Sequence, residues 1–314
     1  MLSAYLPLGL RKELLATPPA VSARKARVQE TALLYADLAG FTPLTEAFAQ
    51  AGPEGVEALA AVLNRVFGGL LDRLHAFGGD LVKFSGDALT CMWPRGEEPP
   101  GDVLVRALAA ALAMQEQMQE YPGVETPAGP FSLSMRVGLA LGRVITLIAG
   151  AEARRFFLVL GPALRRAAQA QSRARPGGIA LDARARAALS GMVTCDRAGR
   201  LMRVLGPLPA PAAALPPPLP DEQARRFLLP ALVQRLQATP ESFLAEFRRV
   251  VPLFVSLEPL GVGRLQRYIG RVLPIIESCG GNLLEVEIGD KGCLLVVLFG
   301  APLSHEAVSY THLT

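Results

Sequence analysis

Two aspartates fifty positions apart are the residues of this chain best suited to chemistry. Asp37 follows the apolar run 31–36 (TALLYA), and Asp87 lies in a glycine turn between two short apolar runs. A carboxylate at the end of a buried run is costly unless a cation or solvent compensates its charge. Two hard oxygen ligands suit Mg²⁺, which takes one or two carboxylates together with substrate phosphates. The pair therefore predicts a site for a divalent cation.

A turn that can bind phosphate directly follows the first aspartate. Residues 38–43 read LAGFTP, so a glycine and the start of a helix would present backbone N–H groups to a polyphosphate. The candidate binding residues are Gly40, Phe41 and Thr42. The simpler alternatives are a turn aspartate at Asp87 and a helix cap at Thr42 followed by a first-turn proline. Taken together, the two motifs favour the functional interpretation.

The other reactive side chains give little indication of catalysis. Two of the three histidines, His305 and His312, lie near the end of the chain, and His75 falls on a predicted helix. The four cysteines are far apart and form no CxxC pair, which argues against a zinc site and against a disulfide framework. Lys83 lies four positions before Asp87 and faces either a ligand or solvent. The sequence thus predicts no nucleophile and base pair.

Composition excludes several classes of protein. The net charge is +4 and the pI about 9.0, but the basic residues are scattered and aromatic residues make up only 6%, so we expect no nucleic-acid binding. The mean hydropathy is +0.31, yet Arg136 and Arg143 interrupt the longest apolar stretch. We therefore expect no membrane span. Because the N-terminus lacks a secretory signal pattern, we expect a cytoplasmic location.

The elements that must position the aspartates follow from hydrophobic periodicity. A strand is predicted at 31–38, and apolar residues at steps of three and four from Val56 to Leu74 predict a helix that ends before Gly78. Two runs separated by a tight turn predict a hairpin. The expected fold is α+β, with helices returning to one mixed sheet. The remaining expected elements are the hairpin strands 81–84 and 88–93, helix 103–119, strands 135–140 and 156–160, helix 162–174 and strand 179–181.

A weak internal repeat predicts two domains. LLYADL at 33–38 aligns with PLFVSL at 252–257, and the glycine pair before the hairpin recurs at 280–281. We expect the second copy to be truncated near Glu306. The expected divisions are an N-terminal extension (1–27), a first domain (28–204), a proline-rich linker and connecting segment (205–245), a truncated second domain (246–307) and an artefactual tail (308–314).

The motif YADLAGFTPLTE, followed by GGDLVKFSGDAL, resembles the two metal-binding segments of class III nucleotidyl cyclases. The tandem copies and the phrase GDKGC at 289–293 are most similar to soluble adenylyl cyclases and their bacterial relatives. This resemblance implies a ferredoxin-like core with a mainly antiparallel sheet and helices on one face. It also implies two such domains paired head to tail, either as a pseudo-dimer of the tandem copies or as a homodimer.

The resemblance also implies site residues and a reaction. Asp37 and Asp87, helped by the Leu38 carbonyl, would hold two Mg²⁺ or Mn²⁺ ions, and the turn through Phe41 and Thr42 would bind the triphosphate. The ribose 3′-hydroxyl would attack the α-phosphorus, giving a 3′,5′-cyclic nucleotide and pyrophosphate. We expect ATP as the substrate, with GTP as the alternative. A diguanylate cyclase is disfavoured because Leu81 and Val82 follow GGD.

The chain departs from the family pattern at several positions. Ser256 stands where the second copy should carry its first metal aspartate, and Glu285 lies near the expected position of the adenine-selecting lysine. Arg165 and Gln169 stand where the family has an asparagine and an arginine. We therefore expect little activity from this chain alone. A catalytically inactive module that controls a downstream ATPase region remains the alternative.

A regulatory pocket is also implied by the resemblance. Lys83 resembles the lysine that lines the second, non-catalytic pocket of soluble adenylyl cyclases, where bicarbonate acts. Arg165, or its neighbour Arg166, would join it there. Bicarbonate is accordingly an expected effector.

Overall fold

The computed structural model describes most of the chain as two compact units. The first-sheet unit comprises residues 28–144 and 161–216, and the second-sheet unit comprises 1–27, 145–160 and 217–314. Each unit is described by itself below. The described residues are 2–16, 26–121, 124–126, 129–151, 153–211, 214–238, 250–258, 260–289 and 292–300.

A mixed sheet forms the centre of the first-sheet unit. Its strand order is β2-β3-β1-β6, with β8 beside β6. β3 pairs antiparallel with both β1 and β2, whereas β6 and β8 run parallel. The expected α+β class with a mainly antiparallel sheet is confirmed. The strands are β1 (Arg27–Ala39), β2 (Asp80–Ser85), β3 (Ala88–Pro94), β6 (Ser134–Gly150) and β8 (Ile179–Leu181).

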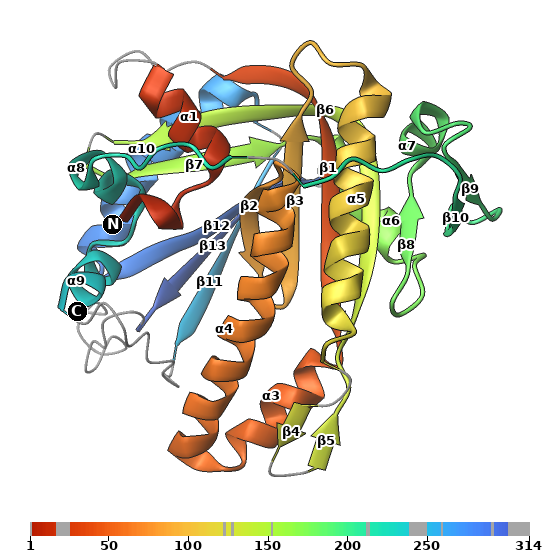
Figure 1. Ribbon diagram of the computed structural model, residues 1–314. Coiled ribbons are helices and arrows are strands. Elements are labelled where there is room, and N and C mark those ends of the chain that lie inside the picture. Colours follow the sequence, from red (N-terminus) through yellow and green to blue (C-terminus); the bar gives the residue numbers. More distant parts are fainter. Residues whose placement is uncertain are drawn as a thin grey trace. The chain divides into compact units, whose positions relative to one another are not determined.

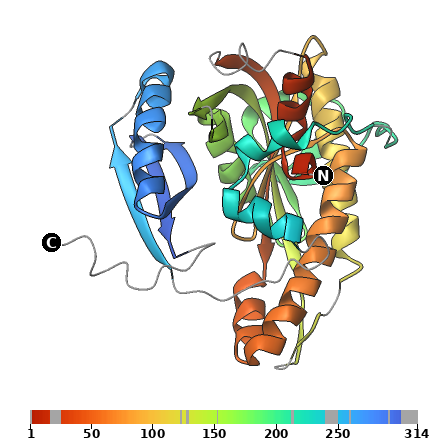
Figure 2. The same cartoon turned by 90° about the vertical axis from the view of Figure 1, so that its left-hand side faces the viewer.

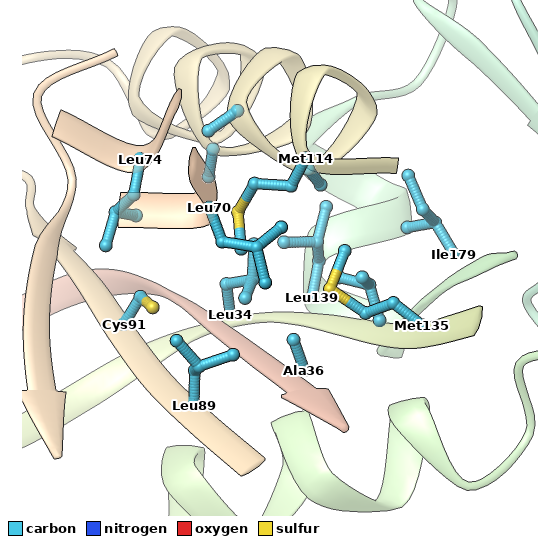
Figure 3. Close-up of a cluster of buried hydrophobic side chains, with 14 of the residues drawn as sticks. Leu34, Ala36, Leu70, Leu74, Leu89, Cys91, Met114, Met135, Leu139 and Ile179 are labelled. Atoms are coloured by element: carbon cyan, nitrogen blue, oxygen red, sulfur yellow. The ribbon is translucent and has the colours of Figure 1, made fainter. Parts of the chain in front are cut away.

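Two long helices, α4 (Gly52–Ala76) and α5 (Pro100–Met118), lie side by side along one face of this sheet (Figure 1). Alternate residues of β1, including Leu34 and Ala36, point toward them, and Leu70 of α4 and Met114 of α5 meet these side chains (Figure 3). The shorter helix α3 (Phe41–Ala49) adds to the same core. Truncating a buried leucine of this core would cost about 2–5 kcal/mol.

Helix α6 (Pro162–Gln171) approaches the opposite face of the sheet. Val137 and Leu139 of β6 point into the core beneath α4 and α5, so Gly138 between them faces the other way. An added Cβ at Gly138 would lie 2.1 Å from the Ala167 carbonyl oxygen of α6. The expectation that the helices lie on one face of the sheet is therefore not met by α6.

Small elements complete the first-sheet unit. Asp182 caps helix α7 (Ala183–Ala188) by accepting a hydrogen bond from the Ala185 N–H at 2.7 Å. Two short antiparallel hairpins were not predicted. They are β4 (Val124–Thr126) with β5 (Gly129–Phe131) and β9 (Val193–Cys195) with β10 (Leu201–Val204).

The second-sheet unit contains a smaller antiparallel sheet in the order β11-β13-β12. Its strands and helix follow the chain order strand, helix, strand, strand, as in the first copy. Figure 2 shows helix α10 lying along this sheet. The elements are β11 (Val251–Leu257), α10 (Val262–Ser278), β12 (Gly281–Gly289) and β13 (Gly292–Phe299).

A hairpin from the first copy contributes to the core of this unit. Residues 145–160, which we call the arm, contain the end of β6 paired antiparallel with β7 (Arg155–Leu160). Leu147 and Leu158 of the arm pack with Leu265 and Ile269 of α10. Apolar side chains that would be exposed on an isolated hairpin are thereby buried.

The N-terminal residues pack in the same unit against the connecting segment. Leu2, Leu10 and Leu14 share a core with Leu228 and with Ile148 of the arm. The Leu2 N–H donates to Asp221 Oδ1 at 2.8 Å. The helices are η1 (Leu2–Tyr5), α1 (Leu8–Ala16), α8 (Asp221–Ala224), η2 (Arg225–Phe227) and α9 (Pro230–Ala238).

The main elements occur where the sequence predicts them, with different lengths. β6 continues ten residues beyond the predicted end at 140, to Gly150, and α3 precedes the predicted helix that becomes α4. None of the described helices combines the length and the apolar content that a membrane span needs. The expected tail 308–314 and the expected end of the second copy near Glu306 lie outside the described residues.

Candidate metal and nucleotide site

Strand register brings the two predicted aspartates to the same end of neighbouring strands. Asp37 on β1 is the direct cross-strand partner of Ala88 on β3, and Asp87 immediately precedes Ala88. The turn between β2 and β3 consists of Gly86 and Asp87, because Ser85 pairs with Ala88 across it. Gly86 has φ +64°, which favours glycine. A tight turn thus fixes Asp87 beside the end of β1.

The two carboxylates affect each other electrostatically. Partial burial raises the pKa of Asp87, its own backbone N–H lowers it by hydrogen bonding, and the negative charge of Asp37 raises it further. Two like charges held together disfavour ionisation until a cation neutralises them. This mutual repulsion and the hard oxygen donors fit a divalent cation.

The donor set suits a cation that also binds substrate. Within the described residues, no group of three or more His, Cys, Asp or Glu side chains is arranged to hold a metal ion. Asp37 and Asp87 alone would therefore leave coordination positions for phosphate oxygens and water. Mg²⁺ is commonly bound in this way.

Two further side chains contact Asp37. Gln171, the last residue of α6, donates from Nε2 to Asp37 Oδ2 at 3.2 Å. The Arg136 guanidinium on β6 forms an ion pair with the same oxygen at 3.7 Å. Neither residue was predicted to be part of the site, and Arg136 was interpreted only as an interruption of an apolar run. The available signal was strand alternation, which places Arg136 on the face away from Met135 and Val137.

The predicted phosphate turn has the required backbone. Gly40 caps α3 with φ +92°, and an added Cβ would lie 2.8 Å from the Ser132 carbonyl oxygen. Glycine is required there on both grounds. A glycine cap carries no side chain that could occupy the first-turn N–H groups of Phe41 and Thr42. Leu38 is buried in the core and fixes the chain between Asp37 and this turn.

Thr42 is not the cap of the helix, which was its alternative role. The helix begins at Phe41 with Gly40 as its cap, so Thr42 lies inside the first turn. Its carbonyl oxygen accepts from the Thr45 hydroxyl at 2.8 Å, and its side chain is exposed. Phe41 is half-buried and packs against the core. Thr42 therefore faces solvent at the end of the helix that follows Asp37.

Lys83 and Arg165, predicted to line a regulatory pocket, lie on separate elements. Lys83 is in the edge strand β2, and Arg165 is exposed on α6, which packs against β6. β3 and β1 lie between those two strands. The neighbouring Arg166 points elsewhere, with Nε donating to Asp182 Oδ2 at 2.9 Å. The bicarbonate pocket stays a prediction.

The second copy carries different groups at the positions of the aspartate pair. Ser256 aligns with Asp37, and its cross-strand partner is Leu294, which follows Cys293. Ser256 and Cys293 thus stand where the first copy has Asp37 and Asp87. Burial raises the pKa of the Cys293 thiol, so neither group is charged at neutral pH. Among the described residues of the second copy, the register places no carboxylate at either of these two positions.

The aspartate pair and the turn at Gly40 lie within a region that matches a known protein family. Residues 23–207 match the family described as the adenylate and guanylate cyclase catalytic domain, which is more than half of the chain. The chain belongs to this family. The cyclase domain therefore includes all of the first-sheet sites described above.

Two curated cyclases are similar to this chain in sequence, and the first of them matches beyond the first copy. Adenylate cyclase type 10 of Mus musculus is 24% identical over 332 residues, covering 89% of this chain and 20% of the relative. Adenylate cyclase 1 of Rhizobium meliloti is 24% identical over 140 residues, covering 44% of this chain and 20% of the relative. The chain thus spans about a fifth of the length of these curated relatives.

Solved cyclase structures are also similar. The guanylyl cyclase Cya2 aligns with a TM-score of 0.48 and 24% identity, over 60% of this chain and 99% of that chain. The adenylyl cyclase CyaB from P. aeruginosa aligns with a TM-score of 0.46 and 21% identity, over 55% of this chain and 85% of that chain.

Proposed function

We propose that this cyclase domain converts ATP into 3′,5′-cyclic AMP and pyrophosphate, with two Mg²⁺ or Mn²⁺ ions held by Asp37 and Asp87. The observation that carries the proposal is the β1–β3 register, which sets both carboxylates at one end of the sheet. Partial burial there raises the pKa of Asp87, and the charge of Asp37 raises it further. When bound, the ions would supply Lewis-acid stabilisation of the triphosphate charge.

The chain's own residues would bind the triphosphate beside that pair. The first-turn N–H groups of α3 follow Asp37 by four and five residues and point along the helix axis, as anion-binding helix termini do. Arg136 provides a second anion-binding group. Its Nε is buried and has no hydrogen-bond partner among the described residues. A cation at Asp37 would displace Arg136 from the carboxylate and leave the guanidinium available for phosphate oxygens.

The reaction requires no covalent enzyme intermediate. A bond forms between the ribose 3′-oxygen and the α-phosphorus, the bond from the α-phosphorus to the bridging oxygen breaks, and pyrophosphate leaves. The proton of the 3′-hydroxyl would pass to a solvent water molecule. In such displacements, binding groups act mainly by positioning the reactants and stabilising charge.

We propose further that a second cyclase domain completes the catalytic machinery. α6 carries Arg165 and Gln169 where the family resemblance places an asparagine and an arginine, and both are exposed. The described elements of the second copy are β11, α10, β12 and β13 and include no counterpart of α6, so another cyclase domain would have to supply these groups. Residues 1–314 alone should therefore show little turnover.

GTP is the alternative substrate because of one residue. Glu285 lies in β12 at the register position that corresponds to Lys83 in β2. A carboxylate accepts hydrogen bonds from guanine N–H groups, whereas a lysine donates to an adenine acceptor. Base choice would then depend on whether Glu285 contacts the nucleotide.

A regulatory module is the second candidate function. Ser256 and Cys293 replace the carboxylate pair in the second copy, and neither can neutralise a cation. The exposed Arg165 on α6 also departs from the catalytic pattern. A domain pair of this kind would bind nucleotide or form a dimer and control a downstream ATPase region without turnover.

Product analysis separates the two candidates. The full-length natural protein and residues 1–314 would each be incubated with Mn²⁺ and either ATP or GTP. An enzyme yields cyclic nucleotide and pyrophosphate in equal amounts from the full-length protein. Saturable nucleotide binding with neither product would instead support the regulatory module.

A further inference from the structure

Helix α6 packs against strand β6 where two glycines of the strand face it. An added Cβ at Gly138 would lie 2.1 Å from the Ala167 carbonyl oxygen and 2.2 Å from the Gln171 backbone nitrogen. An added Cβ at Gly142 would lie 2.1 Å from an Arg166 guanidinium nitrogen. A side chain at position 138 would meet the backbone of α6 and push the helix off the strand, whereas one at position 142 would first displace the Arg166 guanidinium. Gly138 therefore sets the height of α6 above the sheet.

Arg166 fixes the helix along the strand. Its Nε donates to Asp182 Oδ2 at 2.9 Å, and its Nη2 donates to the Leu141 carbonyl oxygen at 2.9 Å. Asp182 is buried and is itself held by the Ala185 N–H. A charge-assisted pair with a buried, hydrogen-bonded carboxylate has a well-defined geometry. α6 is thus anchored at its middle by Arg166.

Gln171 lies at the end of this anchored helix and is only 8% exposed. Its Nε2 donates to Asp37 Oδ2, the same oxygen that pairs with Arg136. Within the described residues, the hydrogen bond and the ion pair of Asp37 both fall on Oδ2 and neither on Oδ1. The carboxylate is therefore held by one oxygen.

The two partners of that oxygen respond differently to a cation. Arg136 carries a positive charge, so a divalent cation at Asp37 would repel it. Gln171 is neutral and buried, and it can keep its hydrogen bond while the cation is bound. Only Gln171 can therefore orient the carboxylate in the loaded site.

We propose that Gln171 is a positioning residue for the cation site, holding Asp37 through Oδ2 so that Oδ1 is presented to the ion. The proposal rests on the proposed function, since it takes Asp37 as a metal ligand. Partners that hold a ligand in place typically contribute about 10- to 100-fold in metal affinity.

The test is Mn²⁺ binding to the full chain, measured by electron paramagnetic resonance with MnCl₂ alone. Gln171→Met keeps the length of the side chain and removes its donor. The matched control is Gln115→Met, because Gln115 is also buried but donates to the Met135 and Gly178 carbonyl oxygens instead. We expect Gln171→Met to weaken Mn²⁺ binding about tenfold and Gln115→Met to leave it unchanged. Thermal unfolding of both variants monitors the fold, and Gln171→Ala serves if Gln171→Met does not fold.

The outcomes separate this inference from the proposed function. If Asp37→Asn loses Mn²⁺ binding while both Gln171 variants bind as the wild type does, the positioning role is wrong and the metal site stands. If Gln171→Met and Gln171→Ala unfold at lower temperatures than the wild type but bind Mn²⁺ with wild-type affinity, Gln171 has only a structural role. If the wild type and Asp37→Asn bind Mn²⁺ equally, the proposed metal site fails and the positioning role with it.

Discussion

Lys83 and Glu285 occupy corresponding positions in the two sheets. Each follows a bulge in an edge strand, and each pairs with a middle-strand residue, Thr90 for Lys83 and Val296 for Glu285. Those two residues pair in turn with Tyr35 and Phe254, which the internal repeat aligns. The two copies thus share one register but carry opposite charges at this point.

Reversing the charge at position 285 should change which nucleotide base the protein prefers. Glu285→Lys replaces an acceptor with a donor, so the ratio of ATP affinity to GTP affinity should rise about tenfold. Competition binding of the two nucleotides in the full-length protein with Mn²⁺ measures the ratio. Glu258→Lys, at an exposed position just after β11, is the control for net charge. An equal ratio in both variants would remove Glu285 from base recognition.

Asp87→Asn should stabilise the metal-free protein at neutral pH. The pKa of Asp87 is raised in the folded state, so its ionisation costs the folded state stability as pH rises above the ordinary value of 3.8. Removing the charge should gain at most about 1 kcal/mol, because the pair is open to solvent that screens it. Urea unfolding at several pH values would show the gain fading toward acid pH. If the gain in unfolding free energy instead grows as the pH falls, the pKa of Asp87 is not raised in the folded state.

Gly40→Ala should damage both the fold and nucleotide binding. The residue has φ +92°, and the new Cβ would lie 2.8 Å from the Ser132 carbonyl oxygen. We expect a loss of about 1–3 kcal/mol in unfolding free energy and weaker ATP binding. Gly68→Ala is the control, since that helical glycine has open space around it and alanine favours helix. Equal ATP affinity in a folded Gly40→Ala variant would exclude the turn as a phosphate site.

Arg136→Gln should affect metal and nucleotide in opposite directions. The guanidinium is a positive charge that competes with the metal for Asp37, so Mn²⁺ alone should bind a few times more tightly without it. ATP in the presence of Mn²⁺ should bind about tenfold more weakly, because a charge-assisted phosphate contact is lost. Isothermal calorimetry measures both affinities. Arg143→Gln, exposed on the same strand, should change neither. If ATP affinity is unchanged in Arg136→Gln, Arg136 does not bind phosphate.

The aspartate pair could be predicted because local signals fix it. A tight glycine turn sets Asp87, an apolar run sets β1, and pairing of the hairpin with β1 brings Asp37 next to Ala88. Gln171 could not be found in this way. Its reach to Asp37 depends on how closely α6 approaches Gly138, which is a contact between segments distant in sequence.

The first strand of the arm was missed for a related reason, whereas the strand predicted at 156–160 is β7. The sequence from 141 to 150 lacks the regular polar alternation of a half-buried strand, so the predicted strand ended at 140. In the structure, Leu147 of β6 is buried by packing with α10. Lys83 and Arg165 were assigned to one pocket by family resemblance alone. Such a resemblance does not show which elements of this chain lie between the two residues.

Cyclic nucleotide formation by aspartate variants of the full-length protein tests the central claim most directly. With Mn²⁺ and ATP, Asp37→Asn and Asp87→Asn should each lower the rate at least about a hundredfold, because several kcal/mol of charge stabilisation are lost. Asp72→Asn, an exposed aspartate on α4, should keep the wild-type rate. Equal rates in all four proteins would contradict the assignment of Asp37 and Asp87 as the metal-binding pair.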